Sequence, residues 1–220
     1  MTVFRAGVPA CLALALLACA AGCAPREGLI RTDGGPVAID GVTVLVVATR
    51  GEKLDPAWDE MGVGFGAAEA LAEELARRGS PKFLIADPSL RNKVREIQAQ
   101  YWKLGAGAEP PADAARGVAE LKPDVIAEAR VLSLEEVSGK AYAGPFQVAR
   151  RTGYATVEVV LQVRGAGGPQ AAAVARASST KGAKIVGGRM DTRKMTFDEY
   201  MIGDAVRKAL ATAADALVAR

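Results

Sequence analysis

The sequence predicts an α/β domain, an α+β sandwich in which helices pack on a mixed sheet. Short runs rich in β-branched residues alternate with longer segments whose apolar residues recur at three- and four-residue spacing. These are the patterns of buried strands and of helices with one apolar face. Half of the 220 residues are apolar, so one hydrophobic core can form without disulfides or a metal. The expected order of elements over residues 41–220 is β-α-β-α-(α)-β-β-β-α.

The first expected strand is Val42–Thr49, because the run VTVLVVAT is too short and too β-branched for a helix. The residues before it, 24–40, are polar, contain proline and glycine and show no period. We therefore predict that residues 23–40 form a tether and that the domain begins at residue 41.

The next segment, Val63–Arg78, has the pattern of an amphipathic helix that ends at Gly79. Its predicted inward side chains are Phe65, Ala68, Ala72 and Leu75, and its predicted outward side chains are Glu69, Glu73 and Glu74.

A second strand is expected at Lys82–Ala86. The following Asp87-Pro88 supplies an N-cap and a first-turn proline for another helix. The apolar residues of that helix are Leu90, Val94, Ile97, Tyr101 and Leu104.

The second half of the domain is expected to be richer in strands. A short helix ends near Leu121, and strands follow at Val125–Leu134, Tyr154–Arg164 and about Ala171–Ser179. A capping box at residues 196–199 opens a final helix that runs to about Ala219. Its predicted inward residues are Ile202, Val206, Ala209, Ala213 and Leu217.

The composition excludes much common chemistry. There is no histidine, and the three cysteines, Cys11, Cys19 and Cys23, all lie near the N-terminus. The body of the protein therefore has no Ser-His-Asp or Cys-His nucleophile and no zinc site built from His or Cys. The acidic pairs Glu73-Glu74 and Glu135-Glu136, like Asp59-Glu60, have the pattern of ordinary exposed acids, since adjacent residues do not face one another. We expect no enzyme activity, no cofactor and no metal site.

Residues 1–22 have the pattern of an export signal. Arg5 is the only charge, and the apolar centre is Leu12–Leu17. The run is too short and too interrupted to favour a membrane span over cleavage. The small residues 20–22 before Cys23 resemble the lipobox of bacterial lipoproteins, which implies that Cys23 is acylated and becomes the first residue after cleavage. The residues before Cys19 also fit this pattern, and an ordinary secretory signal is a further alternative.

That resemblance also implies a location. Ala24 follows the cysteine in place of the aspartate associated with inner-membrane retention, which implies an outer-membrane lipoprotein facing the periplasm. The membrane partner would be bound through the lipid anchor, because several acyl chains on one cysteine make a nearly permanent anchor.

Positive charge is concentrated late in the chain. Residues 137–196 contain ten basic side chains and only two acids, Glu158 and Asp191. These basic residues either line solvated hairpin loops or form a surface for an anionic partner. Nucleic acid is not expected as that partner, because the protein is exported and has few aromatic residues nearby. The candidate surface comprises Arg150, Arg151, Lys181, Lys184, Arg189, Arg193 and Lys194.

A glycine motif also precedes the first predicted helix. Gly62, Gly64 and Gly66 alternate as in some phosphate-binding loops, but they lie far from the preceding strand and no Lys-Ser/Thr follows. We interpret them as easing the entry of the helix.

The order of these segments resembles the curli secretion channel lipoprotein family. The resemblance covers nearly all of residues 41–219 and includes the glycine-led first helix, the Asp124 entry to the third strand and the Ile202-Gly203-Asp204-Ala205 opening of the last helix. The matching segments are VTVLVVA, GVGFGAAEALAEELARRG, KFLIADPSLRNKVREIQ, LKPDVIAEARVLSL, YATVEVVLQV and FDEYMIGDAVRKALATAADALV. Peptidoglycan-synthase activator lipoproteins share the same α/β domain.

In the channels of this family each subunit adds two hairpins that cross the outer membrane. The resemblance places them at about Glu135–Tyr154 and Ala175–Met195. The first contains Pro145 and an arginine pair, and the second is rich in basic residues, neither of which suits a lipid-facing strand. We therefore expect a non-enzymatic assembly or secretion component that binds periplasmic or cell-envelope proteins. The alternatives are a subunit of a homo-oligomeric channel and an activator of peptidoglycan synthesis.

Overall fold

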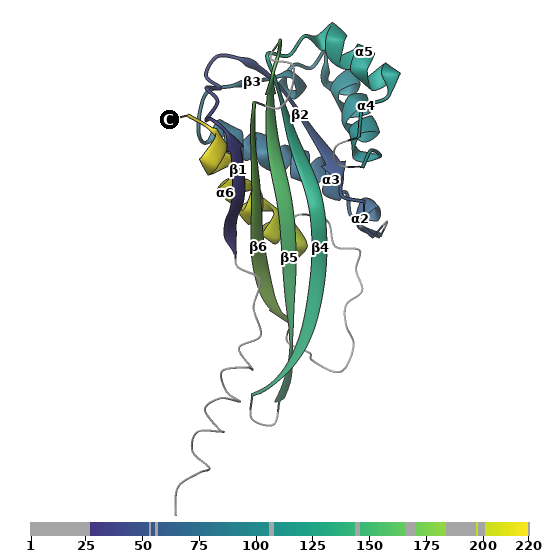
Figure 1. Ribbon diagram of the computed structural model, residues 1–220. Coiled ribbons are helices and arrows are strands. Elements are labelled where there is room, and N and C mark those ends of the chain that lie inside the picture. The colour runs from purple at the N-terminus through teal and green to yellow at the C-terminus, as the bar shows by residue number, and fades with distance from the viewer. Residues whose placement is uncertain are drawn as a thin grey trace, which may run out of the picture.

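The computed structural model describes residues 27–52, 54–55, 57–105, 108–143, 146–165, 170–183, 197 and 201–219. The described chain forms one six-stranded mixed sheet with helices on its faces (Figure 1). This confirms the predicted fold class.

The strands are β1 (Gly28–Gly34), β2 (Thr43–Arg50), β3 (Lys82–Phe83), β4 (Val125–Ala143), β5 (Phe146–Val163) and β6 (Ala171–Ala183). The helices are α2 (Ala57–Glu60), α3 (Val63–Ala76), α4 (Arg91–Trp102), α5 (Ala112–Leu121) and α6 (Met201–Leu217), and a 3-10 turn, η1, spans Leu84–Ala86. In space the strands follow the order β1-β6-β5-β4-β2-β3. Strand β2 runs parallel to β3 and β4, whereas β4, β5, β6 and β1 pair antiparallel.

The main core lies between one face of the sheet and helices α3 and α6. Along β5 the alternate residues Ala155, Val157, Val159 and Leu161 are fully buried, as the period of two predicts. Every predicted inward residue of the last helix is buried as well. On β6 the same face carries small side chains, alanines at positions 171, 173, 175 and 177 followed by the buried Ser179, so α6 can lie close to the sheet.

A smaller core lies on the opposite face, where α4 and α5 cover part of β2. Val94, Ile97 and Tyr101 of α4 are buried there, which confirms the predicted apolar face of this helix. Strand β3 is too short to pair with all of β2, and the Gln98 side chain donates to the backbone oxygen of Val46 at 2.8 Å in its place. One backbone oxygen of β2 beyond the end of β3 is thereby bonded, and α4 covers this edge of the sheet.

The expected tether is partly strand. Residues 28–34 form β1, which pairs with β6 at the edge of the sheet, and Val37 and Ile39 are buried in the main core. The sequence concealed this strand because almost all of its side chains are exposed, so no apolar alternation marks it.

The prediction of the second strand was wrong in its length. Only Lys82 and Phe83 pair with β2, and the chain then turns through η1 so that Leu84 and Ile85 pack on the smaller core. The next helix also begins three residues later than expected, because the Asp87 carboxylate accepts bonds from the amide and hydroxyl of Ser89 at 2.8 and 2.7 Å. Asp87 thus caps a turn that precedes the helix.

Two side chains of α3 lie opposite to the prediction. Phe65 is exposed, and Glu74 is buried. The Glu74 carboxylate is bound by Arg78 at 2.7 Å, and the same guanidinium bonds Asp215 of α6 at 2.9 Å. This bridge ties the end of α3 to α6, which explains why an acid is tolerated on the inner face.

We expect Gly203→Ala to destabilise the domain, because a Cβ at this position of α6 would lie 1.8 Å from the backbone oxygen of Phe197. Alanine has a higher helix propensity than glycine, so propensity alone would stabilise the variant. A loss of about 1–3 kcal/mol in the free energy of unfolding would therefore come from steric overlap. Urea denaturation measures it. Gly35→Ala is the control, since nothing lies within 4 Å of its Cβ. Equal stability of the two variants would contradict the close packing of α6.

Candidate functional site

The antiparallel strands continue beyond the helices that cover the rest of the sheet (Figure 1). Gly153 is packed under α6, where an added Cβ would lie 2.7 Å from Ile202 Cδ1. From this level β4 and β5 remain paired as far as Ala143 and Phe146. We call residues 136–143, 146–153 and 179–183 the extension. Glu135 and Tyr154 pair at its base, so the first predicted hairpin lies where the sequence indicates.

Three residues of the predicted anionic-partner surface lie in the extension. Arg150 and Arg151 are on β5, and Lys181 of β6 pairs in register with Arg151. The Arg151 guanidinium lies 3.4 Å from the Glu136 carboxylate, so its charge is partly balanced. The other four residues, Lys184, Arg189, Arg193 and Lys194, lie outside the described residues, as does Cys23.

Charged side chains bond to one another across the sheet face opposite α3 and α6. Arg130 of β4 lies 3.0 Å from Glu128 on the same strand and 3.0 Å from Glu158 on β5. Arg31 of β1 reaches across β6 to Glu158 at 3.3 Å. We call the connected set Thr49, Glu128, Arg130, Glu158, Arg31 and Asp33 the ion-pair lattice.

The lattice is well shielded near its centre and exposed at its edge. The side chains of Glu128, Arg130 and Glu158 are 10%, 19% and 13% exposed, compared with 61% for Arg31. Burial disfavours the charge of Arg130, but its bonds to both glutamates outweigh burial and raise the pKa of the guanidinium. The two glutamates serve as structural counter-ions here, not as a free acid and base.

The lattice was not anticipated from the sequence. Glu128 and Arg130 are two residues apart, so a strand places them on one face, and Glu158 stands among the apolar residues of the clearest predicted strand. The sequence therefore contains the charges on each strand. Which charges meet across the sheet depends on the register of β4 against β5, and the register is known only from the fold.

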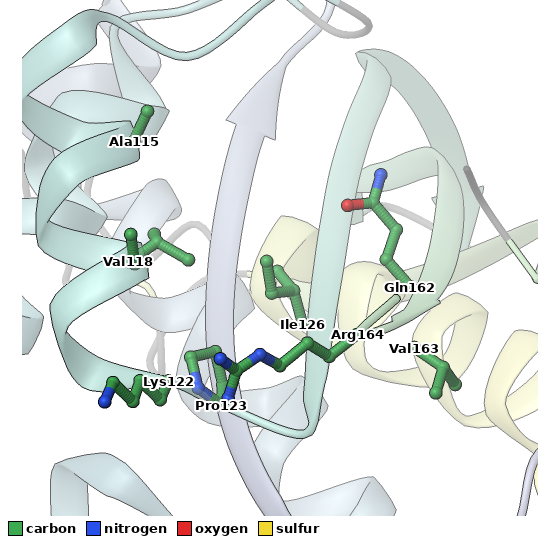
Figure 2. A pocket seen from close by; sticks show the side chains of 9 residues that line it. Ala115, Val118, Lys122, Pro123, Ile126, Gln162, Val163 and Arg164 are labelled. Atoms are coloured by element: carbon green, nitrogen blue, oxygen red, sulfur yellow. The ribbon is translucent and has the colours of Figure 1, made fainter. Parts of the chain in front are cut away.

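A groove of about 350 Å³ lies between α5 and the adjoining ends of β4 and β5 (Figure 2). Val118 lines it from the helix side and Ile126 from the sheet side, whereas Lys122 and Arg164 stand at one end. No ion pair within 4 Å joins either cation to a carboxylate of the described residues. The groove thus combines apolar walls with a positive end.

The nearest acid is directed elsewhere. Asp124 accepts bonds from the backbone amide and the hydroxyl of Thr43 at 2.7 and 2.6 Å. These bonds, more than the nearby Arg164, hold the pKa of the Asp124 carboxyl below its ordinary value. Asp124 therefore fastens the start of β4 to the start of β2 and leaves the cations at the groove unpaired.

In the described part of the chain, no group of three or more Cys, Asp or Glu side chains could hold a metal ion. The described helices also include none that is both long and apolar enough to cross a bilayer.

No family model and no curated protein matches the sequence, so the resemblance to the curli channel family stays a prediction. Similar solved structures include a single-residue variant of the PelC dodecamer from Paraburkholderia phytofirmans, at 12% identity and TM-score 0.48, covering 89% of this chain and 100% of that chain. The hypothetical protein CT253 from Chlamydia trachomatis has 11% identity and TM-score 0.39, covering 78% and 91%. Lipoprotein GNA1162 from Neisseria meningitidis has 13% identity and TM-score 0.36, covering 67% and 88%.

We expect Glu158→Gln to lower the free energy of unfolding by about 1–3 kcal/mol, because both Arg130 and Arg31 lose a charged acceptor and Arg130 is largely shielded from water. Urea denaturation of the two proteins measures the difference. The control is Arg116→Gln, which breaks an exposed pair on α5 and should change stability by less than about 0.5 kcal/mol. A Glu158→Gln variant as stable as the control would show that the lattice contributes little.

Proposed function

We propose that this protein is a non-enzymatic lipoprotein of the outer membrane that faces the periplasm and acts as an assembly or secretion component by binding other proteins. The observation that carries the proposal is the extension, a paired strand structure that projects beyond the helices (Figure 1) and contacts α6 at its base through Gly153 and Ser179. The lipobox-like sequence at Cys23 supports the membrane anchor.

The chain leaves the domain toward Cys23 at the level where the extension begins. Strand β1 runs antiparallel to β6, with Gly28 paired to Arg176. One residue earlier, the Glu27 carboxylate accepts a hydrogen bond from the hydroxyl of Ser178, which lies next to the first residue of the extension on β6. Glu27, which follows Cys23 by four residues in the sequence, therefore lies at the end of the sheet where the extension begins, which supports a role at the membrane.

The arrangement of the carboxylates supports a non-enzymatic role. Glu74, Glu128 and Glu158 are the most shielded acids in the ion pairs described above, and each is bound to arginine. None of them faces the groove. The chemistry that remains at the described surface is contact: apolar walls, a positive end at Lys122 and Arg164, and the strands of the extension. These features suit partner proteins with acidic and aliphatic side chains.

The alternative is a subunit of an oligomeric secretion channel, which the length of the extension favours. From Tyr154 to Phe146, β5 advances eight residues, or roughly 27 Å. From Cys23 to Glu27 the chain advances only four residues, at most about 14 Å. If the extension points toward the membrane that holds the anchor, it is long enough to enter that membrane.

We expect the mature protein to begin at Cys23 and to carry acyl chains there, because this cysteine follows the small residues at the end of the export signal. Mass spectrometry of the N-terminal peptide from membrane-extracted protein measures both properties. Protein with Cys23→Ser should lose the acyl mass and leave the membrane fraction. Cys19→Ser is the matched control and should change neither property. An unmodified N-terminus elsewhere would contradict the anchor.

A second experiment separates the two proposed roles. Full-length protein purified in detergent should be imaged as particles and added to a planar bilayer to measure ion conductance. An assembly component that does not form a pore should give no conductance, because basic side chains in the extension disfavour lipid contact at mid-membrane. Ring-shaped particles that conduct ions would overturn this role and establish the channel.

A further inference from the structure

Two adjacent apolar side chains at the start of β1 face solvent. Leu29 is 48% exposed and Ile30 is 57% exposed. The pairing of β1 with β6 shifts between Leu29 and Arg31, so Ile30 is the extra residue of a β-bulge. Phe65 and Val137 have similar exposure, at 46% and 54%. A single exposed apolar side chain is ordinary, but the two consecutive side chains Leu29 and Ile30 on an edge strand form a small apolar projection.

The chain length to the lipid-bearing residue restricts where this projection can lie. Glu27 is fixed to the sheet through Ser178, and it lies four positions after Cys23 in the sequence. Four residues span at most about 14 Å even when fully extended. A compact domain of about 190 residues is roughly 40 Å across. The anchor is therefore too short to let the domain turn its opposite side to the membrane.

We propose that Leu29 and Ile30 insert into the surface of the lipid leaflet that holds the acyl chains of Cys23. This inference rests on the proposed lipid anchor and adds to it a defined orientation, in which the outer edge of β1 lies against the membrane. Apolar side chains at such a depth meet the boundary between headgroups and acyl chains. The neighbouring charge of Arg31 is balanced, because its guanidinium is paired with Asp33 and Glu158.

The contact can be measured with a single cysteine. Apart from Cys23, residues 23–220 contain no cysteine, so Ile30→Cys gives one thiol that can carry a fluorescent label. The acylated full-length variant is reconstituted into vesicles of phosphatidylethanolamine and phosphatidylglycerol, with or without phosphatidylcholine bearing a nitroxide near the top of its acyl chains. We expect the nitroxide to lower the emission of the label about two-fold or more, since the side chain lies within the leaflet surface.

Phe65→Cys provides the matched control, because Phe65 is similarly exposed but lies in α3, which contacts β2 and β4. Its label should be insensitive to the nitroxide. Leu29→Cys should repeat the result of Ile30→Cys.

Mass spectrometry of the same sample separates the two proposals. An acylated protein whose label at residue 30 is insensitive to the nitroxide would overturn the contact but not the anchor, and a blue-shifted yet insensitive label would assign the projection to a contact between copies of this protein. A protein without acyl chains would overturn both.

Discussion

The close approach of α6 to the sheet is the constraint on which the rest of the structure depends. Alanines on β6 and Gly153 on β5 leave room for the helix, and the aromatic ring of Phe197 occupies the space above Gly66 that any side chain there would fill. The helix also contacts β1, and the backbone amide of Val37, three residues after that strand, donates to the oxygen of Leu217 at 2.7 Å. One helix thereby holds the edge strand, the central strands and α3 in a single core.

The two faces of the sheet are stabilised by different forces. Helices α3 and α6 bury one face with apolar side chains, whereas much of the other face is crossed by the ion-pair lattice and is covered by α4 and α5 only near β2. Apolar burial is not weakened by electrostatic screening, but ion pairs at the exposed edge of the lattice are screened by salt. In the shielded centre of the ion-pair lattice, Arg130 pairs with both glutamates. The ion pairs become weaker toward the exposed side chain of Arg31. A sheet of this kind can leave most of one face in water without fraying.

The sequence predicted the elements whose packing follows a simple period. Strand β5 and helices α4 and α6 have one face that is apolar throughout, so periodicity alone located them. Strand β1 was not predicted, because it lies at an edge of the sheet and is held by backbone pairing rather than by burial of its side chains. The burial of Glu74 was not predicted, because its partner Arg78 also bonds Asp215 of α6, and that contact exists only where the two helices meet. The ion-pair lattice and the groove depend on register between distant segments, which local patterns do not contain, whereas the hairpin position followed from a family resemblance.

The extension has a consequence for how the molecule opens. Below Gly153 the paired strands have lost the support of α6, and their free energy of opening comes from the ladder and its own side chains. Amide protons in this part should exchange with solvent by local opening, while those of β5 near Val157 and Val159 should exchange only when the whole core unfolds. We therefore expect two cooperative units in one sheet. A membrane or a partner protein that binds the extension would suppress its local opening. The free energy of unfolding of the core would not change.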